Sequence, residues 1–337
     1  MRPLQRLGGF KILKDVVWAS VIGPADDETL PARLCRTLAG EGVNLAFLTV
    51  GGSGHPPGAN FVVDVQDVPK VREVLDREFD IQNAAMGEAA VFSLFPHKSD
   101  PLVMGSLLEA FGQKGIHPLA LANSHSAISV VVDRESCEAG VSALFSRFNF
   151  SAYRTPADWK LAQKGKETLY REVVASYQEK RPKVYALELY ESQELWDVRF
   201  TAGRMTRMET AFKTIGESGR FLTFLISSPV SRDVYHFVFC LPATDPHPGD
   251  TTENVLKEDI WARRAPVTVF SMNGPHFGDR YGIVRDLLEA LNGARVNLLG
   301  LSCSIASISG VLLAGQVDGA VAAIKGCFEV PSILVRT

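Results

Sequence analysis

The sequence predicts an α+β fold made of four βαββαβ units with antiparallel sheets, arranged as two pairs. The first observation behind this prediction is an internal repeat: residues 105–148 and 285–328 align 180 positions apart without a gap, with 13 of 44 positions identical. The second is a shorter repeat, in which Val62-Val63-Asp64 recurs as Val131-Val132-Asp133. The third is the alternation of strand-like and helix-like apolar patterns along each copy. Such a repeat indicates copies of one structural unit, so it outweighs local signals.

The second unit, residues 85–156, shows the pattern most clearly. Glu88–Phe95 is a short apolar run bounded by Pro96, which is typical of a buried strand. Asp100 followed by Pro101 predicts the start of a helix that ends at Gly115, with the aspartate as its N-cap residue. The remaining elements follow in order: strands Pro118–Ala122 and Ala127–Val132, a helix through Val141, Leu144 and Phe148, and a last short strand Ser151–Arg154.

The first unit, residues 10–84, and the fourth, residues 263–337, repeat this order. In the first unit we expect strands Val16–Ile22, Val43–Val50 and Asn60–Val65, with a glycine-rich hairpin Gly51–Gly58 between the last two. In the fourth unit we expect strands Pro266–Met272, Asn297–Ser302, Ser307–Ala314 and Pro331–Val335, with helices Asp279–Ala294 and Asp318–Phe328.

The third unit, residues 183–262, follows the pattern less closely. Its expected elements are strand Leu195–Thr201, helix Met205–Gly219, strands Phe221–Ser227 and Val234–Leu241, and a second helix Thr251–Trp261. Residues 157–182 are rich in lysine, glutamine, glutamate and alanine, which predicts a solvated helical linker between the two pairs.

Composition restricts the class of protein. The chain has 337 residues, of which 46% are hydrophobic and 22% charged, as is usual for a globular protein. A net charge of −3 without a basic tract argues against nucleic acid as a partner. No apolar run is long enough to span a bilayer, so we expect no membrane association and a cytoplasmic location. The five widely spaced cysteines indicate buried, reduced thiols rather than a disulfide framework.

Motifs for catalysis are not found in the sequence. It contains no nucleophile elbow, no Walker loop, no paired-carboxylate signature and no Cys/His metal pattern. Gly51-Gly52-Ser53-Gly54 follows a predicted strand but does not open a helix, which argues against phosphate binding. We therefore expect no catalytic residue, no metal site and no cofactor.

Two segments carry a resemblance to a known family. Ile128–Glu135, followed by Val141, Leu144 and Phe148, is similar to the closing strand and helix of the last ACT domain of aspartokinase. Asp279–Val284 resembles the aspartokinase pattern D-x-x-G-I-A that precedes a helix ending in E-A-L.

Tandem βαββαβ units of this length resemble ACT domains, the ferredoxin-like modules that sense amino acids. Lys183–Leu189 followed by Leu195–Phe200 also resembles the hairpin that leads into the first ACT unit of an aspartokinase. Each pair of units therefore resembles the regulatory half of that enzyme. The Lys-Phe-Gly-Gly start of the kinase half has no counterpart, so the resemblance implies a regulatory region without the kinase domain.

The resemblance also implies where a ligand binds. ACT effectors lie between the loop that joins the first strand to the first helix and the second strand of a partner unit, where backbone N–H groups can bind a carboxylate. The implied ligand-binding residues of the fourth unit are Asn273, Gly274, Gly278, Asp279, Gly282, Asn297, Ser302 and Ser304. Those of the second unit are Ser99, Asp100, Asn123, Ser124 and His125, and those of the first are Asp26, Asp27 and Asn44.

Each of these residues has a structural alternative. Asp100 and Asp279 are good helix N-caps, and capping alone explains an aspartate at these places. Asn123, Ser124 and His125 are also common turn residues. His97 and His276 each follow a proline in corresponding loops, which leaves a role for them open.

These observations predict a non-catalytic regulatory protein that senses a small amino acid at contacts between ACT-like units, as a homodimer. The alternative is a ligand-independent module for dimerisation or for docking onto a biosynthetic enzyme. The first three units favour it, because they lack the glycine that the ACT resemblance implies in the loop before the first helix. A divergent enzyme on the same scaffold would need a catalytic constellation that the sequence does not show.

Overall fold

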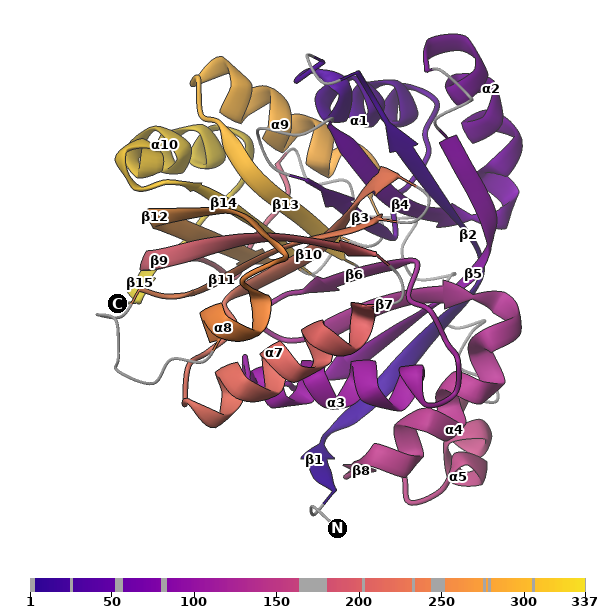
Figure 1. Ribbon diagram of the computed structural model, residues 1–337. Coiled ribbons are helices and arrows are strands. Elements are labelled where there is room, and N and C mark those ends of the chain that lie inside the picture. The colour runs from indigo at the N-terminus through magenta and orange to yellow at the C-terminus, as the bar shows by residue number, and fades with distance from the viewer. Residues whose placement is uncertain are drawn as a thin grey trace.

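The computed structural model describes residues 4–24, 27–51, 57–79, 84–163, 181–201, 204–231, 234–243, 252–274, 277, 280–304 and 307–336. These residues form four layers, in which two layers of strands lie between two layers of helices (Figure 1). Helices α1 (Leu30–Gly40), α2 (Val68–Glu78), α9 (Ile283–Gly293) and α10 (Val317–Cys327) cover one side. Helices α3 (Pro101–Gly112), α4 (Cys137–Arg147), α7 (Met205–Glu217) and α8 (Thr252–Leu256) cover the other.

The strands of the first half of the chain are β1 (Gln5–Leu7), β2 (Gly9–Ile22), β3 (Phe47–Val50), β4 (Gly58–Asp64), β5 (Ala84–Phe95), β6 (Ala120–Asn123), β7 (Ile128–Asp133) and β8 (Phe148–Phe150). Those of the second half are β9 (Ala186–Thr201), β10 (Phe224–Ser231), β11 (Val234–Pro242), β12 (Ile260–Asn273), β13 (Leu298–Ser304), β14 (Ser307–Leu313) and β15 (Ile333–Arg336). Helix α5 (Pro156–Gln163) follows β8.

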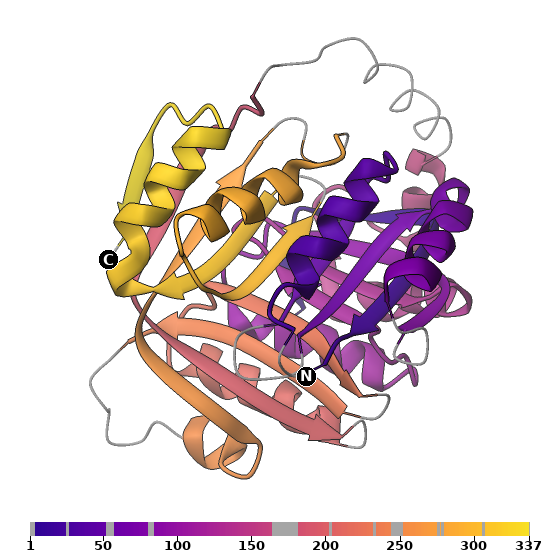
Figure 2. The same cartoon turned by 90° about the horizontal axis from the view of Figure 1, so that it is seen from above.

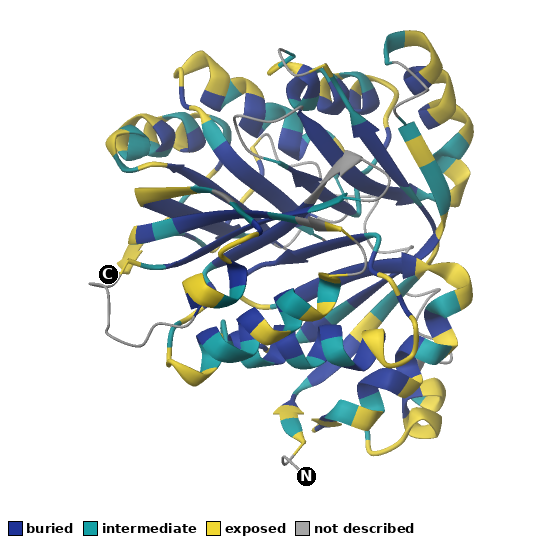
Figure 3. Cartoon of the chain, in the orientation of Figure 1, coloured by how far each residue is buried: buried dark blue, intermediate teal, exposed yellow. Residues whose placement is uncertain are grey.

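One large, mostly antiparallel sheet contains all of these strands except β1 and β8, in a mixed α/β fold. Its order is β11-β10-β6-β7-β5-β2-β4-β3-β13-β14-β12-β9-β15, and β11 also pairs with β9. The β11–β9 pairing closes the sheet on itself, so the strands enclose an inner layer of apolar side chains that includes Phe47, Val62, Val131, Phe224 and Val311. The buried residues in dark blue are concentrated on the strands, and the exposed ones on the outer helix faces (Figure 3).

The four longest strands, β2, β5, β9 and β12, pass from one layer of strands to the other. In β2 the pairing with β5 shifts between Leu13 and Val16, and Asp15 between them has a φ of 56°. In β9 Ser192 has a φ of 52° at the corresponding place. A left-handed residue of this kind makes a bulge that bends the strand, so its two halves can pair in different layers.

These long strands correct two predictions about the closing strands. Ser151–Arg154 is not a strand; instead Gly9–Leu13 of β2 lies beside the Val91–Phe95 half of β5. A strand does form near Pro331–Val335, but β15 pairs in parallel with the outer side of β9, while Ala186–Tyr190 of β9 lies beside β12. The predicted hairpin from Lys183 to Phe200 is also wrong, because Ala186–Thr201 is one continuous strand.

Most helix predictions are confirmed, because their signals are local. Asp100 caps α3 by accepting a hydrogen bond from the backbone N–H of Leu102 at 2.8 Å, with Pro101 as the first helical residue. The second helix of the third unit is shorter than predicted, since α8 ends at Leu256 and β12 begins at Ile260.

The predicted linker helix is described only as far as Gln163, and the hairpin Gly51–Gly58 lies largely outside the described residues. Within the described part of the chain, no helix combines the length and apolar character needed to cross a membrane.

Candidate functional site

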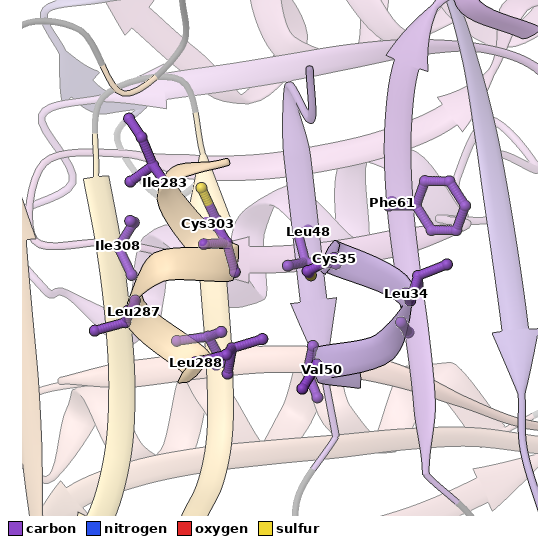
Figure 4. Close-up of a cluster of buried hydrophobic side chains, with 14 of the residues drawn as sticks. Leu34, Cys35, Leu48, Val50, Phe61, Ile283, Leu287, Leu288, Cys303 and Ile308 are labelled. Carbon is purple, nitrogen blue, oxygen red and sulfur yellow. The ribbon is translucent and has the colours of Figure 1, made fainter. Parts of the chain in front are cut away.

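A hollow opens between two helices of the same layer, α1 and α9, which lie side by side (Figure 2). It is a shallow hollow, and the space of about 330 Å³ between its walls includes open solvent. Beneath it the sheet is continuous, because β3 and β13 pair with Leu48 opposite Cys303. Figure 4 shows Cys35 on α1, Cys303 on β13 and Ile283 at the start of α9 in the apolar cluster at this place.

One wall of the hollow comes from the first predicted unit and the other from the fourth. The first wall is the end of α1 with the segment Val43–Leu45 that leads into β3. The second wall is the loop between β12 and α9, including Phe277, Arg280 and Gly282. The loop between β12 and α9 thus faces the segment that leads into β3.

Two glycines shape the loop between β12 and α9. A Cβ atom at Gly274 would lie 2.7 Å from the backbone oxygen of Lys183, so the close approach of these two backbones requires glycine. Gly282 is the N-cap residue of α9 with a φ of 87°, in the left-handed region that favours glycine. A Cβ atom there would also lie 3.2 Å from Nη2 of Arg285.

Two arginines give the hollow its charge. Arg280 and Arg285 both line it, and Nε and Nη2 of Arg285 donate to Oδ1 of Asp286 at 2.9 and 2.6 Å. Neither arginine is among the ligand-binding residues predicted from the sequence, although the position of Arg285 in its helix is a signal that points to it. A cation in the first turn of a helix opposes the helix dipole, so Arg285 near the start of α9 is an unusual choice for stability alone.

Two thiols lie beneath the helices. Cys35 and Cys303 are buried and line the hollow. Burial raises the pKa of each thiol to about 12, and for Cys35 the neighbouring Cys303 adds to the effect. Both therefore stay protonated at neutral pH and act as small apolar groups.

The residues predicted for the fourth unit do not all meet at the hollow. Asn273 is the last residue of β12, Gly274 and Gly282 lie on the loop that follows, and Gly278 and Asp279, like His276, lie outside the described residues. Asn297 is exposed, and its backbone N–H donates to Oε1 of Gln316.

Ser302 and Ser304 do not line the hollow. Strand side chains alternate between faces, and Cys303 takes the face toward the helices. Ser302 is paired with Thr49 and Ser309 in the neighbouring strands, and Oγ of Ser304 lies 2.8 Å from Oγ of Ser307.

In the first unit, Asn44 lines the hollow opposite the loop of the fourth unit. Asp26 lies outside the described residues. Asp27 is engaged by the helix that follows it, because its Oδ2 accepts a hydrogen bond from Nη2 of Arg33 on α1 at 2.7 Å. Burial would raise the pKa of this carboxyl, but the hydrogen bonds from Thr29 and Arg33 hold it below its usual value.

The residues predicted for the second unit are occupied by contacts within the chain. The backbone N–H of Leu222 donates to the carbonyl oxygen of Ser99 at 2.8 Å, and Nδ2 of Asn123 donates to the carbonyl oxygen of Leu222 at 3.2 Å. Nε2 of His97 lies 2.6 Å from the carbonyl oxygen of Ser124. Asp100 caps α3, and Nδ1 of His125 lies 2.8 Å from the hydroxyl of Tyr190.

The groove that corresponds to the hollow is closed between α3 and α7. A Cβ atom at Gly105 would lie 3.1 Å from the backbone oxygen of Glu209, and one at Gly216 would lie 2.5 Å from Cγ of Leu102. These glycines allow the two helices to pack closely, and Leu222 is buried where the groove would continue. The loop of the third unit is described only in part, because residues 202 and 203 are not.

Of the three comparisons with known proteins, the one with solved structures finds similar chains. No protein-family model and no curated protein matches the sequence. Among solved structures, the aspartate kinase from Synechocystis is similar over 95% of this chain, with a TM-score of 0.75 and 16% identity. The shared feature is the fold. This chain spans 56% of the length of the Synechocystis chain.

Other matches each cover less than half of this chain. The regulatory subunit of aspartate kinase from Thermus thermophilus is 22% identical with a TM-score of 0.38, and the match covers 42% of this chain and 99% of that one. Aspartokinase III from E. coli is 14% identical with a TM-score of 0.35, over 44% of this chain and 34% of that one.

Proposed function

We propose that the protein is a non-catalytic regulatory protein that binds a small amino acid in the hollow between α1 and α9. The observation that carries this proposal is the composition of the hollow: the loop before α9 faces Val43–Leu45 of another unit. This is the arrangement that the ACT resemblance implies for an effector site. The buried floor and the open mouth suit a small ligand rather than a macromolecule.

The proposal includes four ferredoxin-like units of ACT type, and the strand pairing supports them. β3, β4, Val16–Ile22 of β2 and Ala84–Glu88 of β5 are consecutive neighbours, which is the strand order of a βαββαβ unit. β13, β14, Val267–Asn273 of β12 and Ala186–Tyr190 of β9 repeat that spatial order, with β9, which precedes β12 in the chain, in the place of the last strand. β6 with β7, and β10 with β11, begin the two equivalent sets in the other layer.

A sensing role follows from the position of the hollow. A ligand there would contact α1 and α9 at once, and these helices come from the two proposed pairs. Binding would therefore change how the first unit sits against the fourth. A ligand can shift such an arrangement only by as much as it binds one arrangement better than the other.

The second candidate is a ligand-independent module for dimerisation or docking onto a biosynthetic enzyme. The closed groove between α3 and α7 favours it, because there the same contact between units is held without a ligand. β15 also forms an edge of the large sheet, and Leu334 and Val335 on it are exposed. Strand edges of this kind are common sites of association.

A thermal-shift screen with the twenty amino acids separates the two candidates. A ligand that binds the native state at a hundredfold excess over Kd stabilises it by about 2.7 kcal/mol, which raises Tm by several degrees. The sensor predicts such a rise with one or a few amino acids. No rise with any of them would contradict the sensor and favour the module.

Two matched variants test the position of the site. Asn44 lies in the hollow, and the exposed Asn297 occupies the corresponding place before β13. Asn44→Leu should fill the hollow and abolish the thermal shift, whereas Asn297→Leu should leave it intact. If both variants respond as the wild type does, the ligand binds elsewhere.

A further inference from the structure

We infer that the hollow binds an amino acid with a short aliphatic side chain, and that four residues beneath the ligand determine this specificity. The inference rests on the proposed function, because it names the class of amino acid that the same site would take. Valine is a member of this class, whereas threonine, lysine and aspartate are not. The four residues form the floor of the hollow and are Cys35, Leu38, Ile283 and Cys303.

The charged side chains around the hollow already have partners within the chain. Nε and Nη2 of Arg285 donate to Oδ1 of Asp286 at 2.9 and 2.6 Å, and Arg280 is also engaged in an interaction of its own. A charged side chain of a ligand would have to compete with these contacts. Gly278 and Asp279 of the same loop lie outside the described residues, whereas the floor is described completely. The choice between ligand side chains therefore falls to the floor.

The floor offers no strong hydrogen-bond partner to a ligand side chain. All four of its residues are buried. Leu38 and Ile283 end in hydrocarbon, and Cys35 and Cys303 carry thiols, which are weak donors and weak acceptors. Burial raises the pKa of both thiols to about 12, so they remain neutral. A hydroxyl or a charged group on this floor would lose its hydrogen bonds to water without replacement, whereas a hydrocarbon side chain would gain from leaving water.

Two backbone groups of Leu45, which lines the hollow, lack the partners that their counterparts have in the closed groove. Leu45 and Leu222 occupy corresponding places, each three residues after a glycine with a positive φ. The N–H of Leu222 donates to the carbonyl oxygen of Ser99 at 2.8 Å, and its carbonyl oxygen accepts from Nδ2 of Asn123 at 3.2 Å. The N–H and the carbonyl of Leu45 make no hydrogen bond with any residue that the structure describes. A carboxylate can accept from this N–H and an ammonium group can donate to this carbonyl, so the side chain of an α-amino acid is left to face the floor.

The depth of the hollow limits the length of that side chain. The space of about 330 Å³ between the walls includes open solvent, so the covered part is smaller. A short aliphatic side chain can be covered by the floor and by Ala39 and Val43 on the wall, while the end of a longer one would remain in water. Each methylene group that is covered should raise the affinity roughly fourfold.

Calorimetric titration of the full chain with valine and threonine tests the inference, because these amino acids have the same shape and differ in a methyl group and a hydroxyl. We expect valine to bind at least about tenfold more tightly than threonine, and more tightly than lysine and aspartate. Cys35→Ser and Cys303→Ser each place a hydroxyl on the floor that can bond to that of threonine, so each should reduce the ratio of the two affinities roughly threefold or more. Cys240→Ser is the matched control, because Cys240 is also buried but belongs to the inner layer between the strands.

The outcomes distinguish a failure of this inference from a failure of the proposed function. If threonine binds as tightly as valine, or lysine or aspartate more tightly, and Asn44→Leu abolishes that binding, the site stands and the inference is overturned. A ratio that neither Cys35→Ser nor Cys303→Ser changes also overturns it, because the floor would then not contact the ligand side chain. If a variant does not fold, the ratio in the wild type still decides. If no amino acid binds, the proposed function fails and the inference fails with it.

Discussion

Nε of Arg36 on α1 lies 2.8 Å from Oε1 of Glu289 on α9, so an ion pair joins the two helices beside the hollow. Their side chains are 62% and 42% exposed. At that exposure water and salt screen the pair, and such pairs contribute little to stability. The contact between α1 and α9 therefore depends mainly on the apolar cluster that both helices share and on the sheet beneath them.

Removal of this ion pair should hardly change the stability of the protein. We expect Arg36→Ala, Glu289→Ala and the double variant each to lower the free energy of unfolding by less than about 1 kcal/mol. A double-mutant cycle from urea denaturation measures the coupling. A coupling energy of several kcal/mol would show that the pair holds the two helices together.

Close packing between α3 and α7 should be sensitive to a single methyl group. A Cβ at Gly216 would lie 2.5 Å from Cγ and 3.0 Å from the backbone N of Leu102. We expect Gly216→Ala to destabilise the protein by about 1–3 kcal/mol, since the helices must separate to accept it. Gly112→Ala is the control, because a Cβ there would meet no atom within 4 Å other than those of its chain neighbours and its own helix backbone. Equal denaturation midpoints for the two variants would contradict the packing argument.

Arg295 should be replaceable by glycine with a gain in stability. Its φ of 56° is left-handed, and the residues at the corresponding places, Gly42, Gly115 and Gly219, have φ values between 68° and 78°. A side chain in this conformation is strained, so we expect Arg295→Gly to raise the free energy of unfolding by about 0.5–1 kcal/mol. Arg295→Ala retains a Cβ and should give no such gain. Thermal denaturation of the two variants provides the comparison.

His97 should make stability depend on pH. Nδ1 accepts from the backbone N–H of Ser99, so Nε2–H donates to Ser124 and the ring is neutral. Burial lowers the pKa of His97 to about 4, although the bond to Ser124 opposes this and nearby His125 adds to it. The unfolded chain, with an ordinary histidine pKa near ~6.5, binds the proton more readily. Stability is therefore fully present above about pH 6.5 and declines as the pH falls toward 4.

The size of this pH effect is at most about 3 kcal/mol. Urea denaturation between pH 7 and pH 4.5 should show a steeper decline for the wild type than for His97→Gln, since carboxylates contribute equally to both. Parallel curves for the two proteins would mean that His97 has the same pKa folded and unfolded.

Elements with local signals could be predicted from the sequence, and pairings over long distances could not. The cap Asp100-Pro101 and the apolar stripe of α4 are determined by neighbouring residues, so α3 and α4 form where expected. The place of Gly9–Leu13 beside β5 depends on a bulge at Asp15, which has no clear sequence signal.

The candidate site shows the same division. Gly282 and Asn44 follow from a repeated pattern, and they line one hollow although they lie near opposite ends of the chain. The polarity of Ser302 predicts a ligand-binding residue, but the alternation of side chains along β13 turns it away from that hollow. Leu222 could not be recognised as closing the other groove, because an apolar residue before a strand carries no such signal.

The bulged strands have a consequence for how this chain could be divided. A fragment of residues 85–156 would leave Val91–Phe95 without the Gly9–Leu13 segment that pairs with it, and residues 263–337 would lose Ala186–Tyr190 in the same way. Each quarter would expose an open strand edge and aggregate. Fragments for expression should therefore be halves rather than quarters, because a half keeps Gly9–Leu13 beside β5 or Ala186–Tyr190 beside β12. The pairings of β3 with β13 and of β6 with β10 still join the two halves of the intact chain.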